Sequence, residues 1–175
     1  MKENKLFNFV LAALFAALIA VFSQISLKLG DIPFTLQTFA VALCAYTIGV
    51  KFSTISIATY LVIGAIGIPV FANFRGGISV LFGATGGFLI GFFVMAICFA
   101  LTYAIKNIPL KIVVNFAGLI GCHLLGTIWF MILSNVGFIQ AITVTSLPFL
   151  LKDIVSMVLA YLIANRLRKV IYKNV

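Results

Sequence analysis

Long uncharged stretches dominate this sequence and constrain its fold more than any other feature. Five of them separate charged residues and are 19 to 40 residues long: 6–27, 32–50, 52–74, 76–105 and 112–151. A helix that crosses a bilayer needs about 20 apolar residues, so each stretch can hold at least one. Charged residues make up 9% of the chain, against about 25% in soluble domains. These proportions exclude an ordinary soluble enzyme, a disordered chain and a disulfide scaffold, and they predict an integral membrane protein.

The longest stretch, 112–151, could hold two helices but would leave no room for a turn between them. Its second part, residues 137–148, contains Gln140, Thr143, Thr145, Ser146 and Pro148, a composition that favours a polar loop. We therefore predict an all-α protein that forms one membrane domain. Its six transmembrane helices are expected at about residues 6–27, 35–50, 52–68, 84–105, 110–134 and 148–172.

The charged residues predict how these helices are oriented. With both termini in the cytoplasm, nine basic residues lie on the inner side and three on the outer side, as the positive-inside rule requires. The inner residues are Lys2, Lys5, Lys51, Lys106, Lys111, Arg166, Arg168, Lys169 and Lys173, and the outer ones are Lys28, Arg75 and Lys152. Because these residues flank apolar helices and do not gather on one soluble face, the net charge of +9 indicates topology and no nucleic-acid partner.

Two charged positions on the outer side are candidates for a binding site. Residues 64–77 are rich in glycine and contain Pro69, so they end the third predicted helix before Arg75. Arg75 either anchors at the lipid headgroups or faces a ligand carboxylate, because an unpaired arginine is costly at membrane depth. Asp153 lies about one turn into the last predicted helix. There it either interacts with the helix dipole while Lys152 extends outward, or it faces inward and accepts hydrogen bonds from a ligand.

A third outer segment, residues 31–38, begins the second predicted helix. Thr35 and Gln37 offer neutral hydrogen-bonding groups, which serve either ordinary capping or a ligand. Because this segment, Arg75 and Asp153 all fall on the outer side, we expect the three segments to line one mouth.

Small residues recur at helical spacing in two of the predicted helices. Ala12, Ala16 and Ala20 form a stripe on the first helix, which is suited to close packing against another membrane helix, in this chain or in another. A similar face on the fourth helix consists of Gly83, Gly87 and Gly91. We interpret the glycine face as mainly structural.

Patterns that would indicate catalysis or a metal site are absent from the sequence. It contains no G-x-x-x-x-G-K-[ST] phosphate loop, and its three acidic residues form no metal cluster or acid–base pair. The single histidine, His123, follows Cys122, but adjacent residues point to different faces of a helix. We therefore predict a hydrogen-bonded histidine, no metal, no cofactor and no enzymatic activity.

Several short motifs together resemble the BioY family of biotin-specific substrate-binding subunits, the S components of energy-coupling factor (ECF) transporters. The resemblance covers residues 6–170 in family order. Its motifs are Ile32-Pro-Phe-Thr-Leu-Gln-Thr, Gly67-Ile-Pro-Val-Phe-Ala, Phe74-Arg-Gly-Gly, Thr85-Gly-Gly-Phe-Leu-Ile-Gly-Phe and the segment from Pro148 to Asp153.

The resemblance implies a six-helix S-component bundle with a biotin pocket near the outer face. Arg75 then meets the valerate carboxylate of biotin, and Asp153 accepts from the ureido N–H groups. Asn73, Thr35 or Gln37 serves the ureido carbonyl or flanks it, while apolar walls come from Phe34, Phe71 and Phe149. Many family members carry a lysine three residues after the acid, where this chain has Ser156 and instead places Lys152 before Asp153. Either Lys152 supplies the cation or the charge is not needed, and the 100° between adjacent residues disfavours a simple exchange.

The resemblance also implies partners and a location. Biotin captured at the outer face would be delivered inward when the chain docks on a transmembrane coupling protein and two ATPase subunits, in a multi-pass bacterial plasma membrane. Ala12, Ala16 and Ala20 match the family's docking stripe. Two alternatives remain open: an S component for another small vitamin or a biotin precursor such as dethiobiotin, and a non-catalytic membrane assembly subunit.

Overall fold

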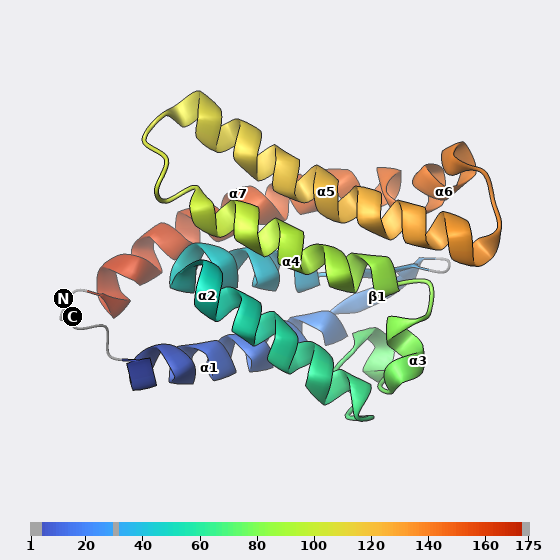
Figure 1. The fold of residues 1–175 in the computed structure, drawn as a ribbon, viewed down its shortest axis with the longest axis horizontal. Helices are drawn as coiled ribbons and strands as arrows, with labels where there is room; N and C mark the ends of the chain where they lie inside the picture. Colours follow the sequence, from blue (N-terminus) through green and yellow to red (C-terminus); the bar gives the residue numbers. More distant parts are fainter. Residues whose placement is uncertain (1–4, 30–31, 173–175) are drawn as a thin grey trace.

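The computed structural model describes residues 5–29 and 32–172. Asp31 lies outside these residues, as do Lys2, Glu3 and Lys173. The described chain is mostly helical (Figure 1). In order, its elements are α1 (Lys5–Gln24), β1 (Ser26–Leu29), β2 (Ile32–Thr35), α2 (Gln37–Ala65), a 3₁₀ turn η1 (Ala72–Phe74), α3 (Ile78–Leu81), α4 (Gly86–Leu101), α5 (Ile108–Ser134), α6 (Phe138–Thr145) and α7 (Leu147–Ile171).

Helix α2 consists of two helical segments that meet at a break. Gly49 interrupts it with φ 77° and ψ 178°, a backbone conformation that glycine adopts without the steric cost of a Cβ atom. The chain reverses there, and both halves run from the break back towards the other end of the molecule (Figure 1). The sequence analysis placed the boundary between its second and third helices at residues 50–52, next to this break.

The first helix is shorter than we predicted, because the chain leaves the helical conformation before residue 27. α1 ends at Gln24, and the next residues form an antiparallel hairpin in which Ser26 pairs with Thr35 and Leu29 pairs with Ile32. Ile32 is buried at the end of the bundle. The hairpin therefore places the start of α2 at this end of the bundle. This arrangement was not predicted from the sequence.

The prediction of a polar loop within residues 137–148 is wrong, since residues 138–145 form helix α6. Gly137 precedes the helix in an extended conformation, and Ser146 separates α6 from α7. Ala141 and Thr145 are fully buried, and Ala141 packs in an apolar cluster with Ile32 and Phe149. Tertiary packing thus stabilises a helix that its β-branched and polar residues disfavour on their own.

Close contact between α4 and α5 organises one side of the bundle. A Cβ atom on Gly87 would overlap Trp129, and one on Gly91 would press against Cys122. The expected glycine face is therefore present at these two positions. Gly83 differs, because its carbonyl accepts a hydrogen bond from the Trp129 indole at 2.9 Å.

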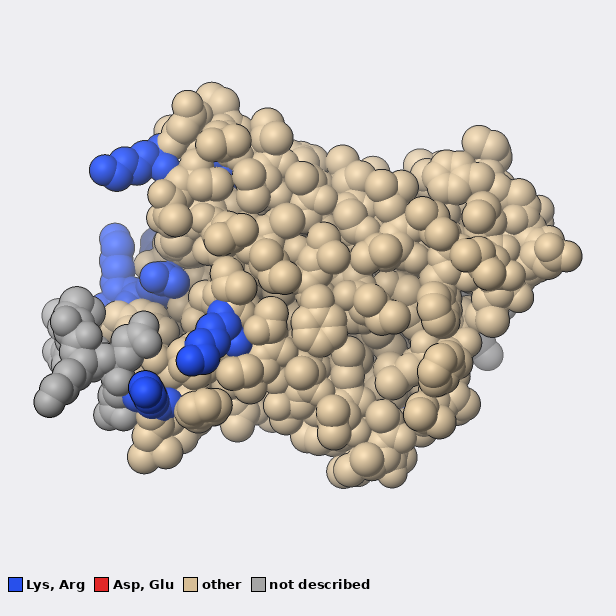
Figure 2. All heavy atoms as spheres, viewed as in Figure 1, with Lys and Arg blue, Asp and Glu red and all other residues tan. Residues whose placement is uncertain are grey.

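Four helices among the described residues are long and apolar enough to cross a membrane: α1, α2, α5 and α7; α4 is apolar but shorter. Lys and Arg gather at the end where α1 begins and α7 ends (Figure 2). The basic residues of the chain segments that meet at this "basic end" are Lys5, Lys51, Lys106, Lys111, Arg166, Arg168 and Lys169. The opposite end, which carries the hairpin, α3 and α6 (Figure 1), is called the "cavity end" below.

Candidate functional site

A cavity lies within the cavity end of the bundle. Its lining comes from β2, both halves of α2, the segment after α2, and helices α3 to α7. The walls are largely apolar and include Phe71, Val80, Leu89, Phe92, Leu119 and Phe149. The space open to the centres of water molecules in this cavity is about 60 Å³, which is enough for several water molecules. Elements distant in sequence thus combine into one apolar chamber with polar groups at selected points.

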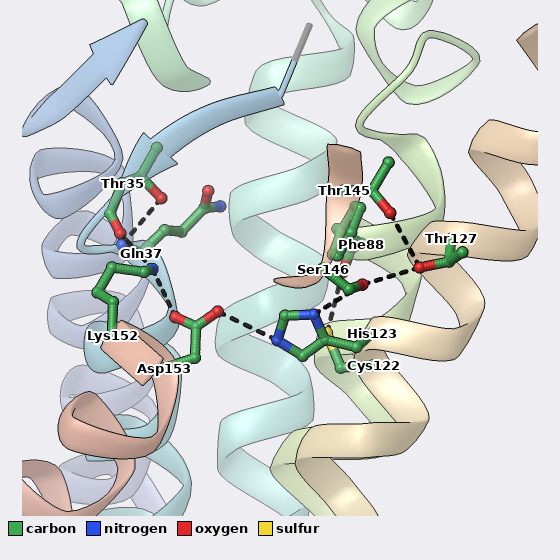
Figure 3. A network of polar contacts seen from close by, with 10 residues as sticks. All are labelled: Thr35, Gln37, Phe88, Cys122, His123, Thr127, Thr145, Ser146, Lys152 and Asp153. Carbon is green, nitrogen blue, oxygen red and sulfur yellow. Dashed lines mark hydrogen bonds and ion pairs between the residues drawn. The ribbon is translucent and has the colours of Figure 1, made fainter. Parts of the chain in front are cut away.

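Asp153 is the acidic group of this cavity and is 4% exposed. The Lys152 ammonium lies 2.5 Å from its Oδ1 atom, and His123 Nε2 lies 3.2 Å from its Oδ2 atom (Figure 3). Two basic side chains therefore hold the carboxylate on opposite sides. A buried carboxylate needs such partners, because its desolvation would otherwise be very costly.

Lys152 reaches Asp153 although the two residues are adjacent on α7. Its side chain folds back across the helix end, donates to the Thr35 carbonyl at 2.7 Å and lies over the Phe34 ring at 5.1 Å. The alternative in which Lys152 extends outward is therefore wrong. The interpretation that Asp153 interacts with the helix dipole is also wrong, since α7 begins at Leu147 and has no acidic residue in its first turn.

His123 connects Asp153 to a chain of three hydroxyl groups. Its Nδ1 atom lies 3.0 Å from Ser146 Oγ, which lies 2.8 Å from Thr127 Oγ1, which in turn lies 2.9 Å from Thr145 Oγ1 (Figure 3). The prediction of a hydrogen-bonded histidine is thus confirmed. Within residues 5–29 and 32–172, no three His, Cys, Asp or Glu side chains are placed to hold a metal ion.

Neutral polar groups line another part of the cavity, where β2 meets α2. The Gln37 side chain donates to the Tyr60 hydroxyl at 2.9 Å, and the Gln37 backbone N–H donates to Thr35 Oγ1 at 3.2 Å. The hydrogen bond to Tyr60 orients the Gln37 amide through its nitrogen. The amide oxygen remains available as an acceptor for other donors.

Arg75 lies at the rim of the cavity and is exposed. Its Nε atom donates to the Ala72 carbonyl at 3.3 Å, and paired backbone hydrogen bonds join it to Phe71. The Phe71 ring rests on Gly64, where a Cβ atom would overlap the ring. Gln24 holds the same segment from α1, because its amide donates to the Phe71 carbonyl and accepts from the Phe74 N–H.

The structure brings together most, but not all, of the site residues expected from the sequence. Seven line the cavity: Thr35, Gln37, Phe71, Arg75, Phe149, Lys152 and Asp153. Asn73 does not; it is exposed and accepts from Ser26. Phe34 packs on Phe149 behind the cavity wall and borders a separate outer groove. Phe34 and Asn73 therefore do not line this cavity.

The alanine stripe also needs a correction. Ala12 and Ala16 are 2% and 4% exposed, because this face of α1 packs against α2, where Ser56 donates to the Ala12 carbonyl. Ala20 is half-buried, whereas Ala13 and Ala17 are exposed. Ala13 and Ala17 are therefore the small residues of α1 that remain exposed to a partner.

Several cavity residues lie inside apolar helices and were not predicted from the sequence. His123 and Tyr60 are the clearest cases, together with Thr145 on the helix taken for a loop. One signal was available: His123 and Thr127 are four residues apart and share one helix face, and two polar side chains on one face of an apolar helix point to a common polar surrounding.

The whole chain also matches a known family. Residues 1–173 fit the sequence model described as the BioY family. The chain belongs to the BioY family. Among curated BioY proteins, the biotin transporter BioY of Thermotoga maritima is 44% identical over 160 residues, which are 90% of this chain and 94% of that protein. The probable biotin transporter BioY of Pyrococcus horikoshii is 39% identical, with the same coverage of 90% and 94%.

A solved structure shares the BioY fold. It is a crystal structure of the S-component for biotin from an ECF-type ABC transporter, with a TM-score of 0.86 and 23% sequence identity over 97% of this chain and 94% of that one. This BioY family member therefore has the S-component fold. Its apolar helices and its relatives make it a multi-pass membrane protein of the cell membrane.

Proposed function

We propose that this protein is the biotin-binding S component of an ECF transporter, which takes up biotin at its cavity end and releases it on the other side of the membrane. The observation that carries this proposal is the cavity itself, with a buried carboxylate held between two basic groups, apolar walls and an arginine at the rim. Biotin has matching chemistry: a ureido ring with two N–H donors, an apolar thiophane and alkyl part, and a carboxylate. The chain binds its ligand and performs no reaction on it.

The polarity of the cavity supports one orientation of biotin. Asp153 lies deep and offers acceptor oxygens, which suits the ureido N–H groups. Arg75 lies at the rim, where its guanidinium suits the carboxylate at the end of the flexible chain. Between them, Phe71 and Phe149 supply apolar contact. We propose that Gln37 either donates to the ureido carbonyl through the second hydrogen of its amide nitrogen or flanks that carbonyl.

We further propose six spans with both termini in the cytoplasm. The spans are α1, the two halves of α2 on either side of Gly49, α4, α5 and α7. The halves of α2 are short, but α2 is the most buried of the long helices, so its neighbours shield it from lipid. The concentration of Lys and Arg at the basic end supports a cytoplasmic location for that end.

Uptake by this mechanism needs partners that couple it to ATP. We propose a transmembrane coupling protein and two ATPase subunits. The exposed face of α1, with Ala13 and Ala17, is the proposed contact for the coupling protein, since small residues allow close helix approach.

The proposal is tested by ligand binding to the purified, detergent-solubilised chain. Biotin should raise its thermal midpoint, because a ligand that binds only the folded state stabilises it. Dethiobiotin lacks the sulfur and probes the apolar walls, whereas biotin methyl ester lacks the charge and probes Arg75. If none of the three raises the midpoint at millimolar concentration, the proposal is wrong. If dethiobiotin binds more tightly than biotin, a precursor is the true ligand.

A further inference from the structure

His123 occupies the junction between the cavity carboxylate and the buried hydroxyl chain. His123 is 7% exposed, and its ring meets the Phe88 ring edge to face, with centroids 5.9 Å apart. Nε2 points to Asp153 and Nδ1 points to Ser146. Both ring nitrogens are therefore engaged, and the imidazole cannot turn without breaking a contact on each side.

The order of hydrogens along this chain follows from the identity of its members. Asp153 is an acceptor when ionised, so Nε2 carries a hydrogen and donates to it. In the neutral imidazole Nδ1 is then an acceptor. Ser146 donates to Nδ1, Thr127 donates to Ser146, and Thr145 donates to Thr127, which gives every hydroxyl hydrogen one acceptor. This order is complete and contains no conflict.

Protonation of His123 reverses that order without breaking it. Nδ1–H then donates to Ser146, Ser146 donates to Thr127, and Thr127 donates to Thr145. The Thr145 hydrogen no longer points at Thr127, and Thr145 lines the cavity. The three hydroxyl groups can therefore satisfy both proton states of the imidazole by rotation alone.

We propose that His123 is a positioning residue for the ligand: by donating from Nε2 it fixes the Asp153 carboxylate in the cavity, so that this carboxylate can accept hydrogen bonds from the ligand. This inference rests on the proposed function. His123 donates one hydrogen bond to Oδ2 and leaves the other acceptor sites of the carboxylate available to the ligand's N–H groups.

The other groups around His123 define what it contributes to the Asp153 carboxylate. α7 presents Asp153 and Lys152, and α5 presents the neighbouring Cys122; Tyr60 of α2 and Arg75 at the rim also line the cavity. α4 contributes the apolar Phe88, and α6 contributes the hydroxyl of Thr145. Lys152 already balances the charge of Asp153. Ligand binding through Asp153 therefore uses His123 as a hydrogen-bond donor that holds the carboxylate, and not as a second charge.

The first test measures biotin affinity by calorimetry on the full chain near neutral pH. His123→Ala should bind biotin about tenfold more weakly, because it removes the donor that holds the Asp153 carboxylate. His123→Gln should regain much of this loss, because its amide can donate to Asp153.

Thr143→Val is the matched control, since it removes an exposed hydroxyl of α6 that bonds only within its own helix. This variant should keep the wild-type affinity. If His123→Ala binds biotin like the wild type, or if His123→Gln binds no better than His123→Ala, the inference is overturned.

A second measurement needs no ligand, because the chain contains one histidine. ¹⁵N-histidine NMR of the labelled protein should show a hydrogen on Nε2, and Asp153→Asn should shift the Nε2 resonance because it changes the partner of that hydrogen. An Nε2 without a hydrogen, or an Nε2 resonance indifferent to Asp153→Asn, overturns the inference. If biotin fails to bind while the NMR result is as expected, the proposed function fails and the positioning of Asp153 by His123 stands.

Discussion

The two ends of this bundle both place polar side chains among apolar helices, but they use them differently. At the basic end, Arg168 donates to the carbonyls of Tyr46 and Thr47 at 3.3 and 3.1 Å, and it stacks over the Tyr103 ring at 4.2 Å. The Tyr46 hydroxyl donates to Asn115 at 2.7 Å. These groups satisfy one another and fill the space between the helices.

At the cavity end, the polar groups surround open space. Asp153 is held by Lys152 and His123 but still borders the cavity, and Arg75 is exposed at the rim. The comparison teaches that a polar residue inside a membrane bundle has two uses. Where it caps a broken helix, as Arg168 caps the first half of α2 before Gly49, it contributes stability. Where it borders a cavity, it contributes recognition.

The largest expected effect on recognition comes from Asp153→Asn. The variant keeps the shape of the side chain but removes the charge that Lys152 and His123 stabilise, and it replaces one acceptor by a donor facing the ureido N–H groups. Hydrogen bonds to charged groups contribute about 1.5–3 kcal/mol each, so biotin affinity should fall about 100-fold. Calorimetry measures the fall, and an affinity within a factor of three of the wild type would contradict the assignment.

Gly64→Ala should act through the cavity wall. The added Cβ atom would overlap the Phe71 ring, which must leave its edge-to-face contact with Tyr60. Overpacking of this kind costs about 1–3 kcal/mol, and we expect about a tenfold loss of affinity and a lower thermal midpoint. Gly137→Ala is the control, because a Cβ atom there meets nothing within 4 Å. Equal behaviour of the two variants would show that Phe71 does not shape the site.

Arg75→Gln should have a smaller effect, because an exposed ion pair is screened by water. We expect about a fivefold loss of biotin affinity. The loss should vanish for biotin methyl ester, since the variant and the ester remove the two halves of one interaction. If the variant binds the ester and biotin with equal losses, Arg75 serves the fold of its segment and does not meet the carboxylate.

The sequence allowed prediction of the features that depend on composition and local pattern. Long uncharged stretches located the apolar helices, and the rarity of charge inside them drew attention to Arg75 and Asp153. It did not reveal helix α6, because only the burial of Ala141 and Thr145 makes that segment helical. Nor did it show that Lys152 folds back to Asp153 or that His123 approaches it from α5, since both depend on the distance between helices. The burial of Ala12 and Ala16 within the bundle was missed for a related reason: spacing identifies a small-residue face but not the helix that packs on it.

The smallest effect on recognition, and a clear effect on stability, should come from Arg168→Met at the basic end. Methionine keeps much of the apolar side chain but leaves the carbonyls of Tyr46 and Thr47 without their charged donor, and buried unsatisfied groups cost about 1–3 kcal/mol. The thermal midpoint of the detergent-solubilised protein should fall. Biotin affinity of the folded fraction should stay within a factor of two, because this cluster lies at the opposite end from the cavity. A loss of affinity as large as that of Gly64→Ala would show that the two ends are coupled, so that the cap at Gly49 also sets the width of the cavity.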